Sequence, residues 1–415
     1  DSGLPWVVFP NSEDSSSSTA PIAVVHVIIL VHGWMGNPME MNALRSSIVE
    51  AFASGADHDK EDDHDKVAML VHCATANDGN THDGIAAGGT RLAKEIQDLV
   101  RRINGIASLT TTKTTLSMVG NSLGGLYARY ALADLHAHFV NNNNNQKLLV
   151  PAIFATTATP HLGVGHGHTY LPLSSGKKKT SRRWMERGVA AVLQQTGADL
   201  FRTPSRTTVV IDDMTFKDAY IAPLRLFRRR LAYANVHGTD FQVPTATAAF
   251  VDPSCTAAKT HRVLDNNING NKDNDFAGSD DDNDNSNTAK TSAQLATALD
   301  RLGWTKVLCD VRQHLPAIPL PRLFRRNNDG ASSSSHQQQL TSAELYQRYA
   351  RWNTDKFYFP AGHTVMVANA KNEAYAQWNK PGKPVMDYLA ADMVQTLLSL
   401  QSSLNYTEDA TSATT

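Results

Sequence analysis

Cysteine is scarce in this sequence, and no apolar run is long enough to cross a membrane. The three cysteines, Cys73, Cys255 and Cys309, lie far apart and form no CxxC pair, which favours neither a disulfide framework nor a zinc site. The longest apolar run, residues 22–31, contains His26 and is about half as long as the ~20 residues that a membrane-spanning helix needs. We therefore expect neither an integral membrane protein nor a fold held together by disulfides or zinc.

The sequence also lacks an excess of charge of either sign. Lys and Arg total 39 and Asp and Glu total 40, which gives a formal net charge of -1. No global field attracts nucleic acid, so no nucleic-acid partner is expected. The hydrophobic fraction of 41% and the length of 415 residues are typical of a globular protein with one large core. One domain with insertions, residues 21–404, fits these values best.

From Val24 onward, segments with strand character alternate with segments with helix character. The expected strands are 24–31, 67–73, 116–119, 152–155 and 231–236, and the expected helices are 39–52, 92–103 and 123–139. This alternation is typical of a mostly parallel sheet with helices on both faces. The predicted fold class is therefore α/β.

Polar segments flank and interrupt this alternation. They are the terminal segments 1–20 and 405–415, a low-complexity insertion at about 265–290 and a polar loop at about 327–340. The low-complexity insertion contains too little apolar surface to offset the entropy lost on ordering, so we expect a solvated loop there. We expect both terminal segments to be disordered. The acidic run Asp280 to Asp282 lacks the ligand order of a calcium-binding EF-hand loop, and no metal site is expected.

The motif Gly120-Asn-Ser122-Leu-Gly124 lies between a short apolar strand and a long helix. This is the setting in which GxSxG forms a nucleophile elbow, a turn so tight that the residues flanking the serine must be small. The elbow presents the serine hydroxyl at a helix N-terminus, where free N–H groups favour developing negative charge. We therefore predict Ser122 as a nucleophile, although a bare GxSxG match is often only a glycine-rich turn.

A second glycine-containing motif, His32-Gly-Trp34-Met-Gly36, follows the first predicted strand. A tetrahedral oxyanion needs two N–H donors from different directions, and a loop at this position supplies one of them in such folds. We predict the backbone N–H groups of Trp34 and Leu123 as the two donors. The alternative is a simple glycine turn, in which His32 shapes the loop.

The strings VIILVHGWMGN, VGNSLGGLYARYAL, ATTATPHLGVG and LAYANVHGTDFQVPTATAAF resemble the serine esterases and lipases of the DUF676 family. The likeness spans about residues 24–250 and resumes at about 340–400. It implies an α/β-hydrolase fold, a Ser, Asp, His triad in that chain order, and action on esters such as monoacylglycerols or phospholipids without a metal or cofactor. One departure is Asn121, which stands where a histidine often precedes the serine.

The predicted acid is Asp240, directly after the strand 231–236. The resemblance supports this position, because the family pattern of Asn, Asp, Val-Pro and Thr maps onto Asn235, Asp240, Val243, Pro244 and Thr245. A carboxylate there would orient a catalytic histidine and stabilise its charged form. The rivals Asp212 and Asp213 precede the strand and fit less well.

The predicted base is His363, chosen from sixteen histidines by its location. It follows a short aromatic strand, residues 357–359, which we expect to be the last strand of the core sheet. The resemblance also gives this histidine the role of proton shuttle, in the chain order Ser, Asp, His. His261 and His314 are rivals beside polar or proline-rich loops, and His161 is expected to shape the entrance.

The segment at about 163–206 lies where such folds carry a lid. It contains the basic run Lys177 to Lys179, Trp184 and an apolar stripe that includes Val192 and Leu193. This combination suits a helix that rests on a lipid surface, with cations near phosphates and the aromatic ring at headgroup level. A helix whose apolar side packs on the sheet explains the pattern equally well.

The prediction that follows is a serine hydrolase of acyl esters, with a lipid or another acyl ester as its substrate partner. Peripheral contact with a membrane or lipid droplet and a cytoplasmic location are expected, although a targeting segment upstream of Asp1 would not be visible. Two alternatives stay open: transfer of the acyl group to another alcohol, and a non-catalytic lipid-binding or scaffolding role. Every triad position is occupied, which favours catalysis.

Overall fold

The computed structural model describes twelve segments of the chain. They are residues 7–8, 22–56, 66–106, 113–140, 149–164, 192–203, 209–254, 261–264, 291–319, 340–350, 356–359 and 361–412. Within them, no helix combines the length and the apolar character that a membrane span requires. Most of the predicted lid, including Trp184, and the polar insertions at 265–290 and 327–339 lie outside the described residues.

The centre of the fold is a sheet of eight strands in the order β1-β3-β2-β4-β5-β6-β8-β7. Its strands are β1 (Val7–Val8), β2 (Ile22–Val31), β3 (Lys66–Cys73), β4 (Lys113–Asn121), β5 (Leu149–Thr157), β6 (Arg229–Asn235), β7 (His261–Leu264) and β8 (Trp304–Cys309). Only β1 runs antiparallel to its neighbour. The mostly parallel sheet confirms the predicted fold class.

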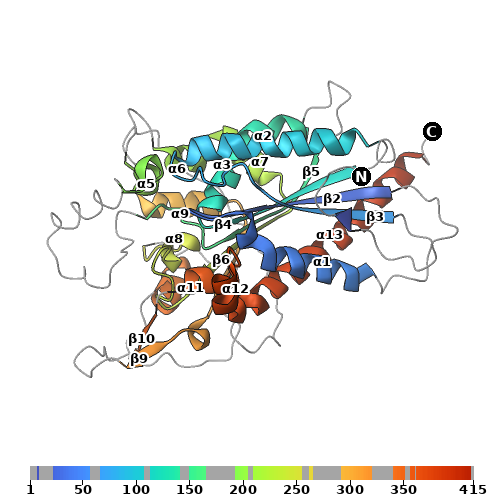
Figure 1. The fold of residues 1–415 in the computed structure, drawn as a ribbon. Helices are drawn as coiled ribbons and strands as arrows, with labels where there is room; N and C mark the ends of the chain where they lie inside the picture. Colours follow the sequence, from blue (N-terminus) through green and yellow to red (C-terminus); the bar gives the residue numbers. More distant parts are fainter. Residues whose placement is uncertain are drawn as a thin grey trace.

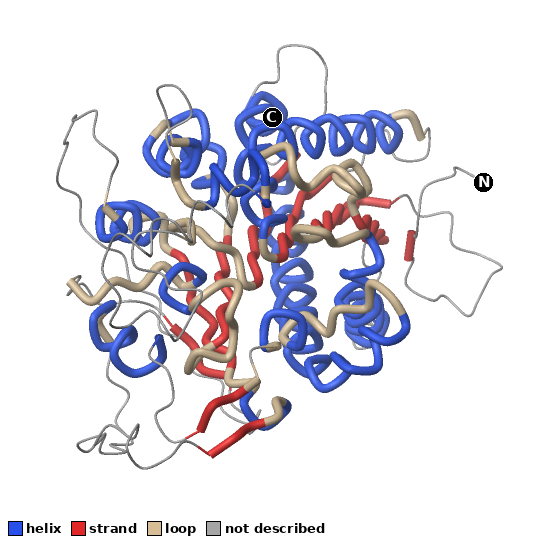
Figure 2. The backbone as a smooth tube through the Cα atoms, turned by 60° about the vertical axis from the view of Figure 1, so that its left-hand side comes forward, coloured by secondary structure: helices blue, strands red, loops and turns tan. Residues whose placement is uncertain are grey.

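Helices cover both faces of this sheet (Figures 1 and 2). The longer ones are α1 (Asn42–Ala56), α2 (Ile85–Asn104), α3 (Leu123–Val140), α5 (Gln194–Leu200), α6 (Val210–Phe216), α7 (Asp218–Arg225), α9 (Ser292–Asp300), α12 (Glu373–Asn379) and α13 (Lys383–Ser412). One face carries α2, α3, α7 and α9, and the other carries α1 and α13 (Figure 1). Each face therefore has its own apolar core, as a sheet buried on both sides requires.

Short helical turns and a hairpin complete the described part. They are η1 (Pro38–Met41), α8 (Thr245–Ala248), η4 (Arg312–His314), α10 (Ser342–Leu345), η6 (Tyr346–Ala350), α11 (Gly362–Val365), η7 (Lys380–Gly382) and the two-stranded sheet of β9 (Ala317–Pro319) and β10 (Lys356–Tyr358). In Figure 1, α8, α11 and this hairpin lie at one end of the central sheet. The loops that follow the parallel strands gather at that end.

Three sequence expectations differ from the structure. The aromatic strand before His363 is not the last core strand, because β10 pairs only with β9, and the core sheet takes its late strands from β7 and β8. Helix α13 continues to Ser412, into the tail 405–415 that was expected to be disordered. The two-residue strand β1 lies within residues 1–20 and pairs with β3. A strand of two or three residues is too short to show a period or to reveal its partner strand, and the polar end of a helix lacks the apolar spacing that periodicity arguments use.

Candidate active site

Ser122 occupies a sharp turn between β4 and α3. Its backbone φ is +52°, a left-handed conformation that costs energy for a residue with a Cβ atom. The N–H of Ser122 donates to the carbonyl oxygen of Thr157 at 2.8 Å, which ties the turn to β5. A Cβ atom on Gly124 would overlap the carbonyl oxygens of Val31 and His32, so only glycine fits there. These features are those of the predicted elbow.

The loop after β2 lies against this elbow because of the sheet register. Val31, the last residue of β2, pairs with Gly120 of β4, so the chain leaves both strands at the same height. A Cβ atom on Gly33 would lie 2.9 Å from the Cβ of Ser122 and 3.4 Å from its Oγ. The loop of residues 32–37, named here the oxyanion loop, therefore passes directly beside the serine.

Within the oxyanion loop, the backbone N–H of Trp34 is left without a partner in the described part of the chain, whereas both neighbouring N–H groups are engaged. Gly33 N–H donates to Oε1 of Glu40 at 2.9 Å, and Met35 N–H donates to Oγ1 of Thr81 at 3.0 Å. This pattern singles out the N–H that was predicted as a donor. Its location beside Ser122 suits binding of a negatively charged oxygen.

The second predicted donor, the N–H of Leu123, is the first of α3. The first N–H groups of a helix have no intrahelical acceptor and lie at the positive end of the helix dipole. Among the described hydrogen bonds outside helices, the N–H of Leu123 makes none. The two predicted donors thus come from separate chain segments on either side of Ser122.

Asp240 lies in the loop after β6, where it is 4% exposed. One oxygen, Oδ1, accepts the backbone N–H groups of Gln242 and Val243 at 2.9 and 2.8 Å. The other, Oδ2, accepts the side-chain amide of Asn235 at 3.1 Å. The carboxylate is therefore held in one orientation, with Oδ2 available to a further donor.

That further donor is His363, which lies in the short helix α11, 123 residues later in the chain. Its Nδ1 lies 2.9 Å from Oδ2 of Asp240. The backbones of the two segments are also joined, by a β-bridge between Asp240 and Ala361 and by the N–H of Gly362, which donates to the carbonyl oxygen of Thr239 at 2.9 Å. The structure thus brings the predicted acid and base into contact.

Electrostatics at His363 favour its protonated form. Burial lowers the pKa of His363, but the charge of Asp240, the hydrogen bond between them and the charge of Glu40 outweigh this effect. The pKa is therefore raised above the ordinary value of 6.5. His363 and Ser122 are both described residues, and no hydrogen bond joins the imidazole to the serine hydroxyl. In hydrolases without a bound substrate this contact is often long and shortens when substrate binds.

The rival candidates are engaged elsewhere. Asp212 bonds Arg202 and Asp213 pairs with Lys217, both on the α6 side of the fold. His261 lies in β7 and His314 in the turn η4. None of these four is placed against Asp240 or Ser122 by a described contact.

His161, expected at the entrance, is fully buried instead. Its Nε2 lies 2.9 Å from Oγ1 of Thr156, and Nδ1 lies 3.4 Å from the guanidinium of Arg129. Burial and the charges of Arg129 and Lys306 hold the pKa of His161 well below 6.5. His161 is therefore a neutral, buried side chain that holds the turn after β5 in place.

Glu40 is the functional candidate that sequence reasoning missed. It is 4% exposed and accepts hydrogen bonds from the backbone of Gly33 and, at 2.7 Å, from the side chain of Asn121. The available signal was a single acidic residue between two methionines in η1, in a segment treated simply as the start of a helix. Asn121, noted as a departure from the family pattern, therefore has a defined role as a donor.

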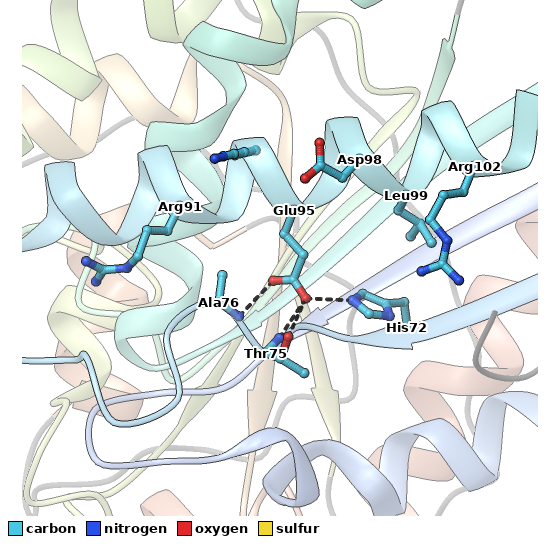
Figure 3. Close-up of a pocket in the computed structure, with 9 residues that line it drawn as sticks. His72, Thr75, Ala76, Arg91, Glu95, Asp98, Leu99 and Arg102 are labelled. Carbon is cyan, nitrogen blue, oxygen red and sulfur yellow. Dashed lines mark hydrogen bonds and ion pairs between the residues drawn. The ribbon is translucent and has the colours of Figure 1, made fainter. Parts of the chain in front are cut away.

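A separate pocket of about 430 Å³ lies between the end of β3 and α2 (Figure 3). Glu95 lies in it and accepts bonds from His72, Thr75 and Ala76, with distances of 2.8 to 2.9 Å. These contacts hold the end of β3 and the loop after it in place, so the carboxylate has a structural role. Across the described segments, no group of three or more His, Cys, Asp or Glu residues could hold a metal ion.

This chain is similar in sequence to the proteins of one known family. The profile described as "Putative serine esterase (DUF676)" matches residues 22–256. A Schizosaccharomyces pombe protein named as a putative lipase is 28% identical over 234 residues, covering 54% of this chain and 26% of the relative. The chain thus spans about a quarter of the length of that relative.

Solved structures match this chain at lower similarity. A gene product of Listeria innocua is 15% identical over 70% of this chain and 83% of its own, with a TM-score of 0.28. A siderophore hydrolase of Aspergillus fumigatus is 12% identical over 58% and 80%, with a TM-score of 0.31. These scores are too low to add to the argument, whereas the profile covers more than half of the chain. The chain therefore belongs to the DUF676 family of serine esterases and has an α/β-hydrolase fold.

Proposed function

We propose that this protein hydrolyses carboxylic acyl esters through Ser122, His363 and Asp240. The observation that carries the proposal is the buried contact of 2.9 Å between His363 and Asp240, two residues that are 123 positions apart in the chain. A histidine whose Nδ1 faces a carboxylate offers Nε2 as a base. Its pKa, raised above 6.5, suits proton transfer near neutral pH.

The proposed reaction has two stages. The Oγ of Ser122 attacks the ester carbonyl carbon while His363 takes the hydroxyl proton and then gives it to the leaving alcohol. The N–H groups of Trp34 and Leu123 stabilise the negatively charged oxygen of the tetrahedral intermediate. Water, activated by His363, then hydrolyses the acyl-enzyme and restores the free serine.

Replacement of Ser122 by alanine tests this assignment. We expect kcat on a short-chain p-nitrophenyl ester to fall by at least about 10³-fold, because the acyl-enzyme cannot form. Ser117→Ala is the matched control: this serine lies in β4, directly before the elbow, and its buried hydroxyl has no hydrogen-bond partner among the described residues. A fluorophosphonate probe should label the wild-type protein and Ser117→Ala, but not Ser122→Ala. Full activity of Ser122→Ala would end the proposal.

We further propose that the ester belongs to a lipid. Two methionines on or beside the oxyanion loop, Met35 and Met39, have 60% and 53% of their surface exposed, so this region presents apolar side chains to the outside. The similarity to a relative named as a lipase supports the same substrate class. Hydrolysis rates on monoacylglycerols and lysophospholipids, measured below and above their aggregation concentrations, test it. Equal rates on soluble short esters and on aggregated lipids would contradict it.

A further inference from the structure

Glu40 is a buried carboxylate whose hydrogen bonds come from neutral groups. Only 4% of its surface is exposed, and no Lys or Arg in the described segments forms an ion pair with it. Taking a carboxylate out of water is costly unless hydrogen bonds or opposite charge compensate. The compensating groups at Glu40 therefore indicate what the residue does.

Its compensating hydrogen bonds come from the two segments that flank the serine. Oε1 accepts the backbone N–H of Gly33 at 2.9 Å and the side-chain amide of Asn121 at 2.7 Å. The amide of Asn121 is itself fixed, because its Oδ1 accepts the hydroxyl of Thr157 at 3.0 Å. Bonds to a charged acceptor are about twice as strong as bonds between neutral groups. One carboxylate oxygen thus clamps the oxyanion loop to the elbow.

The oxyanion loop is shaped around the same carboxylate. A Cβ atom on Gly36 would overlap Oε2 of Glu40 and lie 3.0 Å from the carbonyl oxygen of Gly33. The N–H of Gly36 donates to that carbonyl oxygen at 3.1 Å, which closes a tight turn. With the N–H of Gly33 held by Glu40, the next N–H along the loop, that of Trp34, stays free beside Ser122.

Glu40 also acts on the histidine. The charged groups that stabilise protonated His363 are Asp240, from the loop after β6, and Glu40, from η1. Asp240 contacts Nδ1 directly, whereas Glu40 makes no hydrogen bond to the imidazole and acts through its charge. The charges of two carboxylates from different parts of the chain would therefore stabilise an imidazolium formed during the reaction.

We propose that Glu40 is a positioning residue that holds the oxyanion loop against the elbow and supplies a second negative charge to His363. This inference rests on the proposed esterase function. Glu40 does not touch the reacting atoms; it acts through Gly33, Asn121 and the imidazole. Its two effects, on geometry and on charge, are separable by substitution.

Glu40→Gln removes the charge and keeps an oxygen that can accept both hydrogen bonds. We expect the acidic limb of the kcat/KM profile to move to lower pH, because loss of the negative charge makes His363 easier to deprotonate. Glu40→Ala removes the clamp as well. We expect its kcat to fall by about 10- to 100-fold with KM changed by less than about threefold, since a misplaced oxyanion donor costs transition-state stabilisation.

Glu50→Gln is the matched control, because Glu50 lies in α1, is exposed and pairs with Lys383 on the surface. Its kinetics should match those of the wild type. The titration of the His363 ring, followed by NMR on protein labelled at histidine Cε1, reports the charge effect without any substrate. His363→Gln identifies the resonance.

The outcomes separate the two proposals. A lower titration midpoint of His363 in Glu40→Gln, but not in Glu50→Gln, supports the charge role of Glu40. This holds even if the protein hydrolyses no ester, a result that would contradict the esterase proposal alone. If Glu40→Gln leaves the His363 midpoint and the acidic limb of kcat/KM unchanged, and Glu40→Ala leaves kcat unchanged, the inference about Glu40 is overturned. Ester hydrolysis by the wild-type protein would still support the esterase proposal. If Glu40→Ala does not fold, the kinetics of Glu40→Gln and the titration of His363 still test the charge role of Glu40.

Discussion

Replacement of Asp240 by asparagine should almost abolish ester hydrolysis while the fold is kept. The asparagine oxygen can take over Oδ1 and still accept the N–H groups of Gln242 and Val243. The new NH2 group would then occupy the position of Oδ2, which accepts from His363 and Asn235. His363 would have to present an unprotonated Nδ1 to it. The proton would move to Nε2, where the imidazole could no longer accept the proton of a serine hydroxyl.

The expected size of this effect follows from the tautomer. A histidine locked in the wrong tautomer lowers kcat by about 10⁴-fold, which corresponds to about 5.5 kcal/mol of transition-state stabilisation. KM should change little, because Asp240 is 4% exposed and held by groups of its own loop. Circular dichroism and the thermal midpoint should show a folded protein with slight destabilisation, since the amides of Asp240→Asn and Asn235 now oppose each other.

Steady-state kinetics on p-nitrophenyl butyrate, with fluorophosphonate labelling as a second readout, measure the loss. Asp213→Asn is the control, because this rival carboxylate forms an i,i+4 ion pair with Lys217 and its loss should leave kcat within about twofold. A decrease of less than about tenfold in Asp240→Asn, with the protein folded, would refute the role assigned to the contact of 2.9 Å. An equal decrease in Asp213→Asn would show that the loss is not specific.

Two further predictions follow from the same region. Gly124→Ala should lower the free energy of unfolding by more than about 2 kcal/mol, because the added methyl group meets the backbone carbonyls of Val31 and His32, which cannot move as a flexible side chain does. Chemical denaturation measures this change. The control is Gly105→Ala, at a C-cap with φ of -76°, which should change the free energy of unfolding by less than about 0.5 kcal/mol. The acidic limb of the kcat/KM profile should have its midpoint above pH 6.5, because the neutral form of His363 is the base and the pKa of His363 is raised. A midpoint below pH 6.5 would show that the charges of Asp240 and Glu40 do not outweigh the effect of burial on this pKa.

The elbow could be predicted from sequence because its causes are local. Small residues at Gly120 and Gly124, an apolar strand before them and a helix after them are all present within about 25 positions. The strand and helix boundaries in this region are close to those of β4 and α3. The chain order of nucleophile, acid and base then reduced the choice of Asp and His to a few positions.

The reason given for His363 was wrong in part, although the residue does contact Asp240. The short aromatic strand before it was expected to end the core sheet, but β10 pairs with β9 outside that sheet. What brings His363 to Asp240 is the bridge between Ala361 and Asp240 and the bond from Gly362 to Thr239. Such pairing between segments about 120 residues apart leaves no periodic mark on either segment.

The sequence by itself determined the parallel α/β architecture, the tight turn at Ser122 and the family, because these depend on residue type, local periodicity and short motifs. Only the tertiary structure decided which N–H of the oxyanion loop stays free, how His363 reaches Asp240, and that a buried Glu40 joins the oxyanion loop to the elbow. These depend on which groups packing brings within about 3 Å, and hydrogen-bond energies fall too steeply with distance and angle for sequence spacing to specify them.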